Sequence, residues 1–163
     1  MKIWYAIYVK SKSEKKVASE LAKNGINHYL PIKKVLKQWS DRKKWVEEPL
    51  FRSYVFVNID PKDYYTVLQT HGVVKYITFE GKAVSIPQQQ IDAIRYFLSE
   101  ESPEVLESYR WNEGQKVEII SGSMTGLIGK LIEIKGKNWL KVEIEAIGHS
   151  ITIQIQKNKL KPL

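Results

Sequence analysis

The sequence predicts an α+β domain followed by a small all-β barrel, and three observations support this prediction. Within residues 1–98, short alternating segments typical of strands are interrupted by three segments with helical spacing. Beyond residue 113 the helical spacing stops, and four alternating segments follow, separated by Gly, Asn or Ser. Residues 99–113 contain five acidic residues and one basic residue. We therefore expect domains at 1–98 and 114–163, joined by an acidic linker at 99–113.

Boundary residues justify each element of the first domain. The first helix is bounded by Ser13, which suits an N-cap, and by Gly25, which suits a helix end. Pro61 suits the first turn of the second helix, which Gly72 ends, and Pro87 suits the first turn of the third. The predicted order is β-α-β-β-β-α-β-α, which favours helices packed on one face of a mostly antiparallel sheet. The expected elements are strands at 3–9, 27–37, 43–48, 54–59 and 73–79, and helices at 15–24, 61–70 and from 87 onward.

The second domain is predicted from alternation alone. Its segments are KVEIISG, LIGKLIEIK, WLKVEIEAI and SITIQIQ, in which Leu140, Val142 and Ile144 alternate with charged residues. Strands this short and this closely spaced indicate an antiparallel barrel. Because β-branched residues at period two fit an amphipathic helix poorly, we expect this domain to remain β-structured.

Composition excludes several kinds of function. The net charge is +8, which favours a polyanion such as nucleic acid as a partner, and the chain has no cysteine, which excludes disulfides and thiolate chemistry. The three histidines lack ligand-like spacing, and Leu131 stands where a phosphate loop needs Ser or Thr after Gly129-Lys130. We expect a protein that is not an enzyme and has no cofactor or metal. The short apolar run at residues 3–9 predicts a cytoplasmic protein without a membrane partner.

The segment PLFRSYVFVNI raises a question about the two faces of one strand. Alternation places Tyr54 and Phe56 on one side, and Val55, Val57 and Ile59 on the other. Predicted helices can cover the aliphatic side, which leaves the aromatic side facing away. These rings are either core or, as a contiguous exposed patch, the docking surface for a protein partner.

The basic stretch KKVLKQWSDRKK (33–44) is a second candidate feature. It contains six Lys and Arg residues, one Asp and Trp39. It is either a solvated hairpin tip or an arm that follows phosphates, with Trp39 stacking on a base. The sequence favours neither interpretation.

Long segments of the chain resemble NusG-type transcription elongation factors. The segments WYAIYVKSKSEKKVASEL, EPLFRSYVFVNID and THGVVKYI resemble the NusG N-terminal (NGN) domain, and NEGQKVEIISGSMTGLIGKLIEI resembles the KOW domain that follows it. The EPLF segment and the short spacing look closer to the specialised RfaH and UpxY types. This resemblance implies a ferredoxin-like first domain and an SH3-like KOW barrel.

The resemblance also implies roles for individual residues. In the family the sheet face without helices grips the clamp helices of RNA polymerase. The residues at matching positions are Tyr8, Phe51, Tyr54, Phe56, Tyr76, Phe79 and Ile91, and Thr66 would contact the polymerase gate loop. The residues that would approach the non-template DNA strand are Lys10, Gln69, Thr70 and His71. In the KOW loop, Gly122, Gly126 and Gly129 keep the family pattern, which predicts positive φ angles or close backbone approach.

These expectations combine into one functional hypothesis. The chain would be a monomeric elongation and antitermination factor that binds polymerase and non-template DNA and suppresses pausing and termination at selected operons. Its KOW barrel would recruit a ribosomal protein or Rho. The alternative is a ribosome-associated RNA-binding protein, because KOW barrels also occur in ribosomal proteins and the chain is basic.

Overall fold

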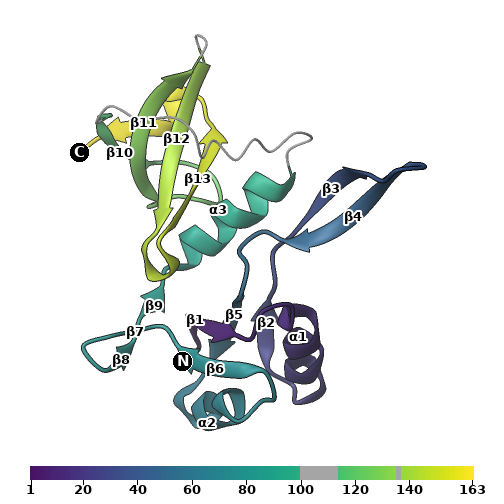
Figure 1. The fold of residues 1–163 in the computed structure, drawn as a ribbon. Helices are drawn as coiled ribbons and strands as arrows, with labels where there is room; N and C mark the ends of the chain where they lie inside the picture. The colour runs from purple at the N-terminus through teal and green to yellow at the C-terminus, as the bar shows by residue number, and fades with distance from the viewer. Residues whose placement is uncertain (100–113, 135–136) are drawn as a thin grey trace. The chain divides into compact units, whose positions relative to one another are not determined.

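The computed structural model describes residues 1–99, 114–134 and 137–163, and its contacts form two compact units, Met1–Ile86 and Pro87–Leu163 (Figure 1). The predicted linker at 99–113 lies outside the described residues, except for Ser99. The contacts group the last helix of the predicted first domain with the second unit. The two units are therefore described separately.

The first unit is built on a five-stranded antiparallel sheet. Its path is β2 (Asn27–Tyr29), β5 (Tyr54–Ile59), β1 (Ile3–Val9) and β6 (Val73–Tyr76), and β9 (Ser85–Ile86) also pairs with β1. The predicted strands at 3–9 and 54–59 have the predicted bounds. These two strands pair along the whole of β5, from Ile3 opposite Ile59 to Tyr8 opposite Tyr54.

Two helices cover one face of this sheet (Figure 1). In α1 (Glu14–Lys23), Val17 and Leu21 are four residues apart and lie on one stripe, which is fully buried. The 3-10 turn η1 (Pro61–Asp63) leads into the short helix α2 (Tyr64–Leu68), which buries Val67. The core between these helices and the sheet consists of Ile7, Val9, Val17, Leu21, Ile26, Val55, Val57, Ile59, Val67 and Tyr76.

Two further hairpins lie outside the sheet. The first joins β3 (Ile32–Gln38) to β4 (Lys43–Pro49), and Figure 1 shows it extending away from α1 and the sheet. The predicted strand at 27–37 is therefore two strands, separated at Pro31, which has no N–H to donate to a sheet ladder. The second joins β7 (Thr78–Phe79) to β8 (Lys82–Ala83), with positive φ at Glu80 and Gly81 in the turn.

The second unit contains α3 (Gln88–Ser99) and a five-stranded antiparallel sheet. The strands are β10 (Lys116–Ile119), β11 (Ile128–Ile134), β12 (Lys137–Ile144), β13 (His149–Gln154) and β14 (Leu160–Pro162), in the order β13-β12-β11-β10-β14. The 3-10 turns η2 (Glu145–Ile147) and η3 (Lys157–Lys159) connect its later strands. Its core includes Leu140, Val142 and Ile144, the residues whose alternation predicts the strand. The α+β fold with a β-structured second domain is thus confirmed.

Helix α3 packs against β12 and β13 of its own unit. Its buried residues are Ile91, Ala93, Ile94 and Phe97. Across the described ranges, the helices are all too short or too polar to span a lipid bilayer.

Candidate functional site

Strand register fixes which residues share the sheet face opposite α1 and α2. Tyr8 is paired with Tyr54, Ala6 with Phe56 and Trp4 with Asn58. Directly paired residues lie on the same face, and their neighbours Ile7 and Val55 belong to the core under the helices. Tyr8, Tyr54 and Phe56 therefore do lie together on the face that α1 and α2 leave uncovered.

The rings on this face contact one another. The Tyr8 and Tyr54 rings meet edge to face, with centroids 5.8 Å apart. The Phe56 ring is edge to face with Phe51 at 6.3 Å and stacked on Tyr29 at 6.4 Å. Tyr29 was not among the residues predicted for this face. It ends a strand of only three residues, in which alternation is too short to assign a face, and only its pairing with Phe56 places it here.

The expectation that this whole face is exposed is wrong. Phe56 is fully buried and Phe51 is 4% exposed, so these two rings pack inside the protein. Tyr8 is 38% exposed and Tyr54 is partly buried. The aromatic face therefore has a buried part around Phe56 and an accessible part formed by the Tyr8–Tyr54 pair.

Tyr76 belongs to the opposite face, which corrects its predicted position. It is paired with Ile7 in the core under the helices and is 2% exposed. Its hydroxyl donates a hydrogen bond to the Tyr64 carbonyl at 2.8 Å, and its ring stacks on Tyr64 with centroids 4.2 Å apart. Burial raises the pKa of the Tyr76 phenol above its ordinary value, because it penalises the charged phenolate. Tyr76 thus joins β6 to α2.

The other predicted polymerase-binding residues are not gathered on this face. Phe79 is 70% exposed, but it lies on the separate β7–β8 hairpin, opposite Lys82. Thr66 is exposed on α2, and Ile91 is fully buried in α3 of the second unit. The sheet face of the first unit therefore includes Tyr8, Tyr54, Phe51 and Phe56 from the predicted set.

The predicted DNA-contacting residues do lie together. The Lys10 backbone N–H donates to the Gly72 carbonyl at 2.9 Å, which ties the end of β1 to the turn that carries Gln69 and His71. Lys10, Gln69 and His71 are exposed. Thr70 is 8% exposed, and its hydroxyl donates to the Thr66 carbonyl at 2.9 Å, so its predicted exposure to bases is wrong.

Gly72 holds this turn in place. Its φ is +95°, and a Cβ atom there would lie 2.8 Å from Cγ2 of Val17 in α1. Both observations require glycine, because other residues rarely adopt that φ and α1 leaves no room for a side chain. The turn is thus fixed against the buried stripe of α1.

The KOW-loop glycines meet both parts of the sequence expectation. Gly122 and Gly126 have φ of +89° and +94°. Gly129 instead lies in β11, where a Cβ would be 2.6 Å from the Lys141 carbonyl oxygen. Close approach of β12 therefore requires the third glycine, and backbone conformation requires the first two.

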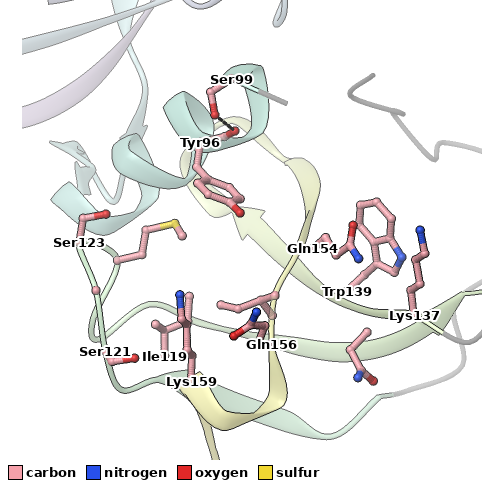
Figure 2. A pocket seen from close by; sticks show the side chains of 14 residues that line it. Tyr96, Ser99, Ile119, Ser121, Ser123, Lys137, Trp139, Gln154, Gln156 and Lys159 are labelled. Carbon is pink, nitrogen blue, oxygen red and sulfur yellow. Dashed lines mark hydrogen bonds between the residues drawn. The ribbon is translucent and has the colours of Figure 1, made fainter. Parts of the chain in front are cut away.

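Gly122 borders an open groove of about 990 Å³ in the second unit. Figure 2 shows Tyr96 extending from α3 into it, above Ile119, with Trp139 and Lys137 along another side. Its lining also includes Ser99, Ser121, Ser123, Met124, Asn138, Gln154, Ile155, Gln156 and Lys159. The charged residues in this lining are two lysines, so the groove offers aromatic, amide and positively charged groups.

A smaller groove of about 380 Å³ lies where Gln89 and Gln90 of α3 face β11 and β12. Gly126 and Gly129 line it, beside Lys116 and Lys141. The three KOW-loop glycines thus border open surface next to α3. In the residues that the structure covers, no three His, Asp or Glu side chains gather as metal ligands would.

Residues 2–95, more than half of the chain, match the family described as "Transcription termination factor nusG". The chain belongs to the NusG family. It is 21% identical over 174 residues to the transcription termination/antitermination protein NusG of Lactococcus lactis subsp. lactis (strain IL1403), with 98% of this chain and 92% of that protein covered. The NusG family match includes the whole sheet of the first unit and most of α3.

A solved structure supports the same fold. The structure titled "Domain interaction in Thermotoga maritima NusG" matches with a TM-score of 0.51 and 21% identity, covering 100% of this chain and 98% of that one. The α+β unit and the following β-structured unit are therefore the fold of a NusG-type protein.

Proposed function

We propose that this NusG-family chain is a transcription elongation and antitermination factor that binds the clamp of RNA polymerase through the sheet face carrying Tyr8 and Tyr54. The observation that carries the proposal is the accessible ring pair on the face that α1 and α2 leave uncovered. Aromatic side chains are enriched at binding hot spots, and a partner can bury them at small entropic cost. Membership of the family supplies the transcriptional context.

The burial of Phe56 and Phe51 divides this face into two roles. In this conformation Phe56 is inaccessible, so it supports the surface from below and Tyr8 and Tyr54 make the contact. Burying one such ring contributes about 1.5–3 kcal/mol, and two supply less than the roughly 8 kcal/mol that a micromolar complex needs. The complex therefore needs additional contacts.

The turn next to Lys10 is the proposed source of additional binding energy. Lys10 neutralises a phosphate of the non-template strand, and the exposed side chains of Gln69 and His71 hydrogen-bond to unpaired bases. Thr66, exposed on α2, contacts the polymerase gate loop. A protein that holds both sides of the DNA cleft in this way disfavours clamp opening, which reduces pausing and termination.

The second unit recruits a further protein, with a ribosomal protein or Rho as the proposed partners. The grooves bordered by Gly122 and Gly126 support this role, because they place polar and aromatic groups at an open surface. We further propose that the chain is a specialised factor of the RfaH or UpxY type, acting at selected operons. This finer assignment rests on the EPLF…YVFV segment of the sequence.

A pull-down with purified RNA polymerase tests the clamp contact. Tyr8→Ala should weaken polymerase binding at least tenfold and lower the melting temperature little, because Tyr8 is already 38% exposed. Trp45→Ala is the matched control, since Trp45 is 65% exposed but lies on β4 of the separate hairpin, outside the five-stranded sheet. Equal polymerase binding by the two variants would refute the proposed surface.

An elongation assay then tests the outcome of binding. Purified polymerase should pause less and read through terminators more often when the protein is added, and Tyr8→Ala should remove this effect. If polymerase binding fails in the unmodified protein while structured RNA binds tightly, the ribosome-associated alternative replaces this proposal.

A further inference from the structure

The β3–β4 hairpin is strongly basic, although no residue in it is assigned to the polymerase or DNA surfaces above. Six Lys and Arg residues lie in residues 33–44, with one Asp. Register places Lys37 directly opposite Lys44, which is an unfavourable pairing of like charges. Lys37 also forms an ion pair with Glu48, but both are solvent-accessible, and such pairs contribute little stability. A polyanion bound at this end of the hairpin would relieve the repulsion.

The hairpin also exposes two tryptophans, Trp39 and Trp45. Trp45 is 65% exposed and is directly opposite Leu36, which is 45% exposed. This cross-strand apolar pair gives Trp45 a structural role on the hairpin. Trp39 is 52% exposed at the tip, where its backbone N–H donates a hydrogen bond to the Arg42 carbonyl at 2.7 Å. Its backbone thus closes the hairpin, while its indole ring is available to a ligand.

Trp39 directly follows β3, and its backbone hydrogen bond to Arg42 continues the pairing of the two strands. Alternation continued by one residue past the strand end therefore puts its side chain on the face of Lys37 and Lys44. This face therefore combines an accessible indole with two opposed ammonium groups, and Arg42 lies across the tip from Trp39. That is the combination by which proteins bind single-stranded nucleic acid, in which aromatic rings stack on bases and cations follow the phosphates.

We propose that the tip of the β3–β4 hairpin binds single-stranded nucleic acid, with Trp39 stacking on an unpaired base and Lys37, Arg42 and Lys44 neutralising adjacent phosphates. An unpaired base is required because the bases of a duplex are already stacked, so a duplex contact would use only the cations. The site is separate from the proposed Lys10 turn, which lies at the end of β1.

Fluorescence anisotropy with the full-length protein tests this proposal. The probes are labelled oligo-dT, oligo-rU and a DNA duplex, each measured at several salt concentrations. Trp39→Ala should weaken single-strand binding at least about fivefold, the lower end of the reported range for base–aromatic stacking. The combined variant K37Q/R42Q/K44Q should make the slope of log K against log salt less steep by about 2, as expected for three single-strand phosphates.

A charge-matched variant separates local contacts from net charge. The variant K16Q/K62Q/K82Q removes an equal number of positive charges, three, from exposed lysines of the first unit that lie outside the β3–β4 hairpin. It should retain a larger fraction of single-strand binding and a steeper salt slope than the hairpin variant. Circular dichroism and thermal melts of every variant check folding, and Trp39→Ala should melt like the unmodified protein because its ring is exposed.

Four results would overturn the proposal, and the first three concern the nucleic-acid probes. These are binding that Trp39→Ala leaves unchanged, equal losses in the two triple variants, and duplex binding as tight as single-strand binding. Binding of poly-glutamate as tight as that of oligo-dT would also overturn it, since the hairpin would then select charge alone. The better of oligo-dT and oligo-rU identifies the nucleic acid, and either preference supports the proposal. Because no polymerase is present, failure here leaves the proposed clamp contact intact, and failure of the polymerase pull-down leaves this site intact.

Discussion

Replacing Phe56 by alanine separates a structural role from a binding role for the aromatic sheet face. Phe56 is fully buried, and its ring contacts those of Phe51 and Tyr29. Truncating a buried phenylalanine removes its transfer free energy and leaves a cavity, at a cost of about 3–5 kcal/mol. For a unit the size of Met1–Ile86, each kcal/mol lowers the melting temperature by about 4–8 °C. We therefore expect Phe56→Ala to lower the melting temperature of this unit by at least about 12 °C.

The assay is differential scanning calorimetry, combined with hydrogen exchange of the β5 amides to assign the transition to the first unit. Phe79→Ala is the matched control, because Phe79 is 70% exposed on the β7–β8 hairpin. Its truncation should change the free energy of unfolding by less than about 0.5 kcal/mol. If Phe56→Ala melts like Phe79→Ala, Phe56 faces solvent in the free protein, and its structural role is refuted.

Two further predictions concern the elements that hold the site in place. Gly72→Ala should lower the free energy of unfolding in urea by more than about 1 kcal/mol, because it combines a positive φ with a clash against Val17. Gly81→Ala is its control and should lower that free energy by less, because Gly81 has a positive φ but open space around it. Tyr76→Phe should cost about 1–3 kcal/mol, because it leaves the Tyr64 carbonyl without its hydroxyl donor. Since burial raises the folded pKa of Tyr76, its contribution to stability is present below the unfolded value near 10.0 and is lost as pH rises above it. Urea unfolding between pH 9 and 11 should therefore show a weaker alkaline loss in Tyr76→Phe than in the unmodified protein, and equal losses would contradict this assignment.

Sequence patterns predicted individual strands better than the relations between strands. Alternation within 3–9 and 54–59 was sufficient to give both bounds and the two faces of β5. Tyr76 was placed on the wrong face because the side of a residue depends on cross-strand register, and a shift of one residue reverses it. Register between β1 and β6 is irregular between Tyr8 and Val9, which no single-strand pattern reveals.

The sequence also did not predict which residues of the second sheet face are buried. Alternation shows that Phe56 and Tyr54 share a face, but not that Phe56 is covered while its neighbour is only partly so. In contrast, the resemblance to NusG-type factors grouped Lys10 with the turn at residues 69–71, and the hydrogen bond from Lys10 to Gly72 does bring these two chain segments together. Thr70 was the exception, since its hydroxyl is used by a backbone carbonyl four residues earlier.

The hydrogen bond between the Lys10 amide and the Gly72 carbonyl connects the proposed polymerase contact at Tyr8 with the proposed DNA contact at the turn. Tyr8 precedes Lys10 by two residues on the same chain segment, so restraining the ring also restrains the loop on the far side of that bond. A ligand that orders one end leaves less disorder for a second ligand to remove at the other, and thermodynamic reciprocity makes the benefit mutual. Polymerase binding would then raise the affinity of this protein for DNA, and DNA binding would raise its affinity for polymerase, without any change of fold.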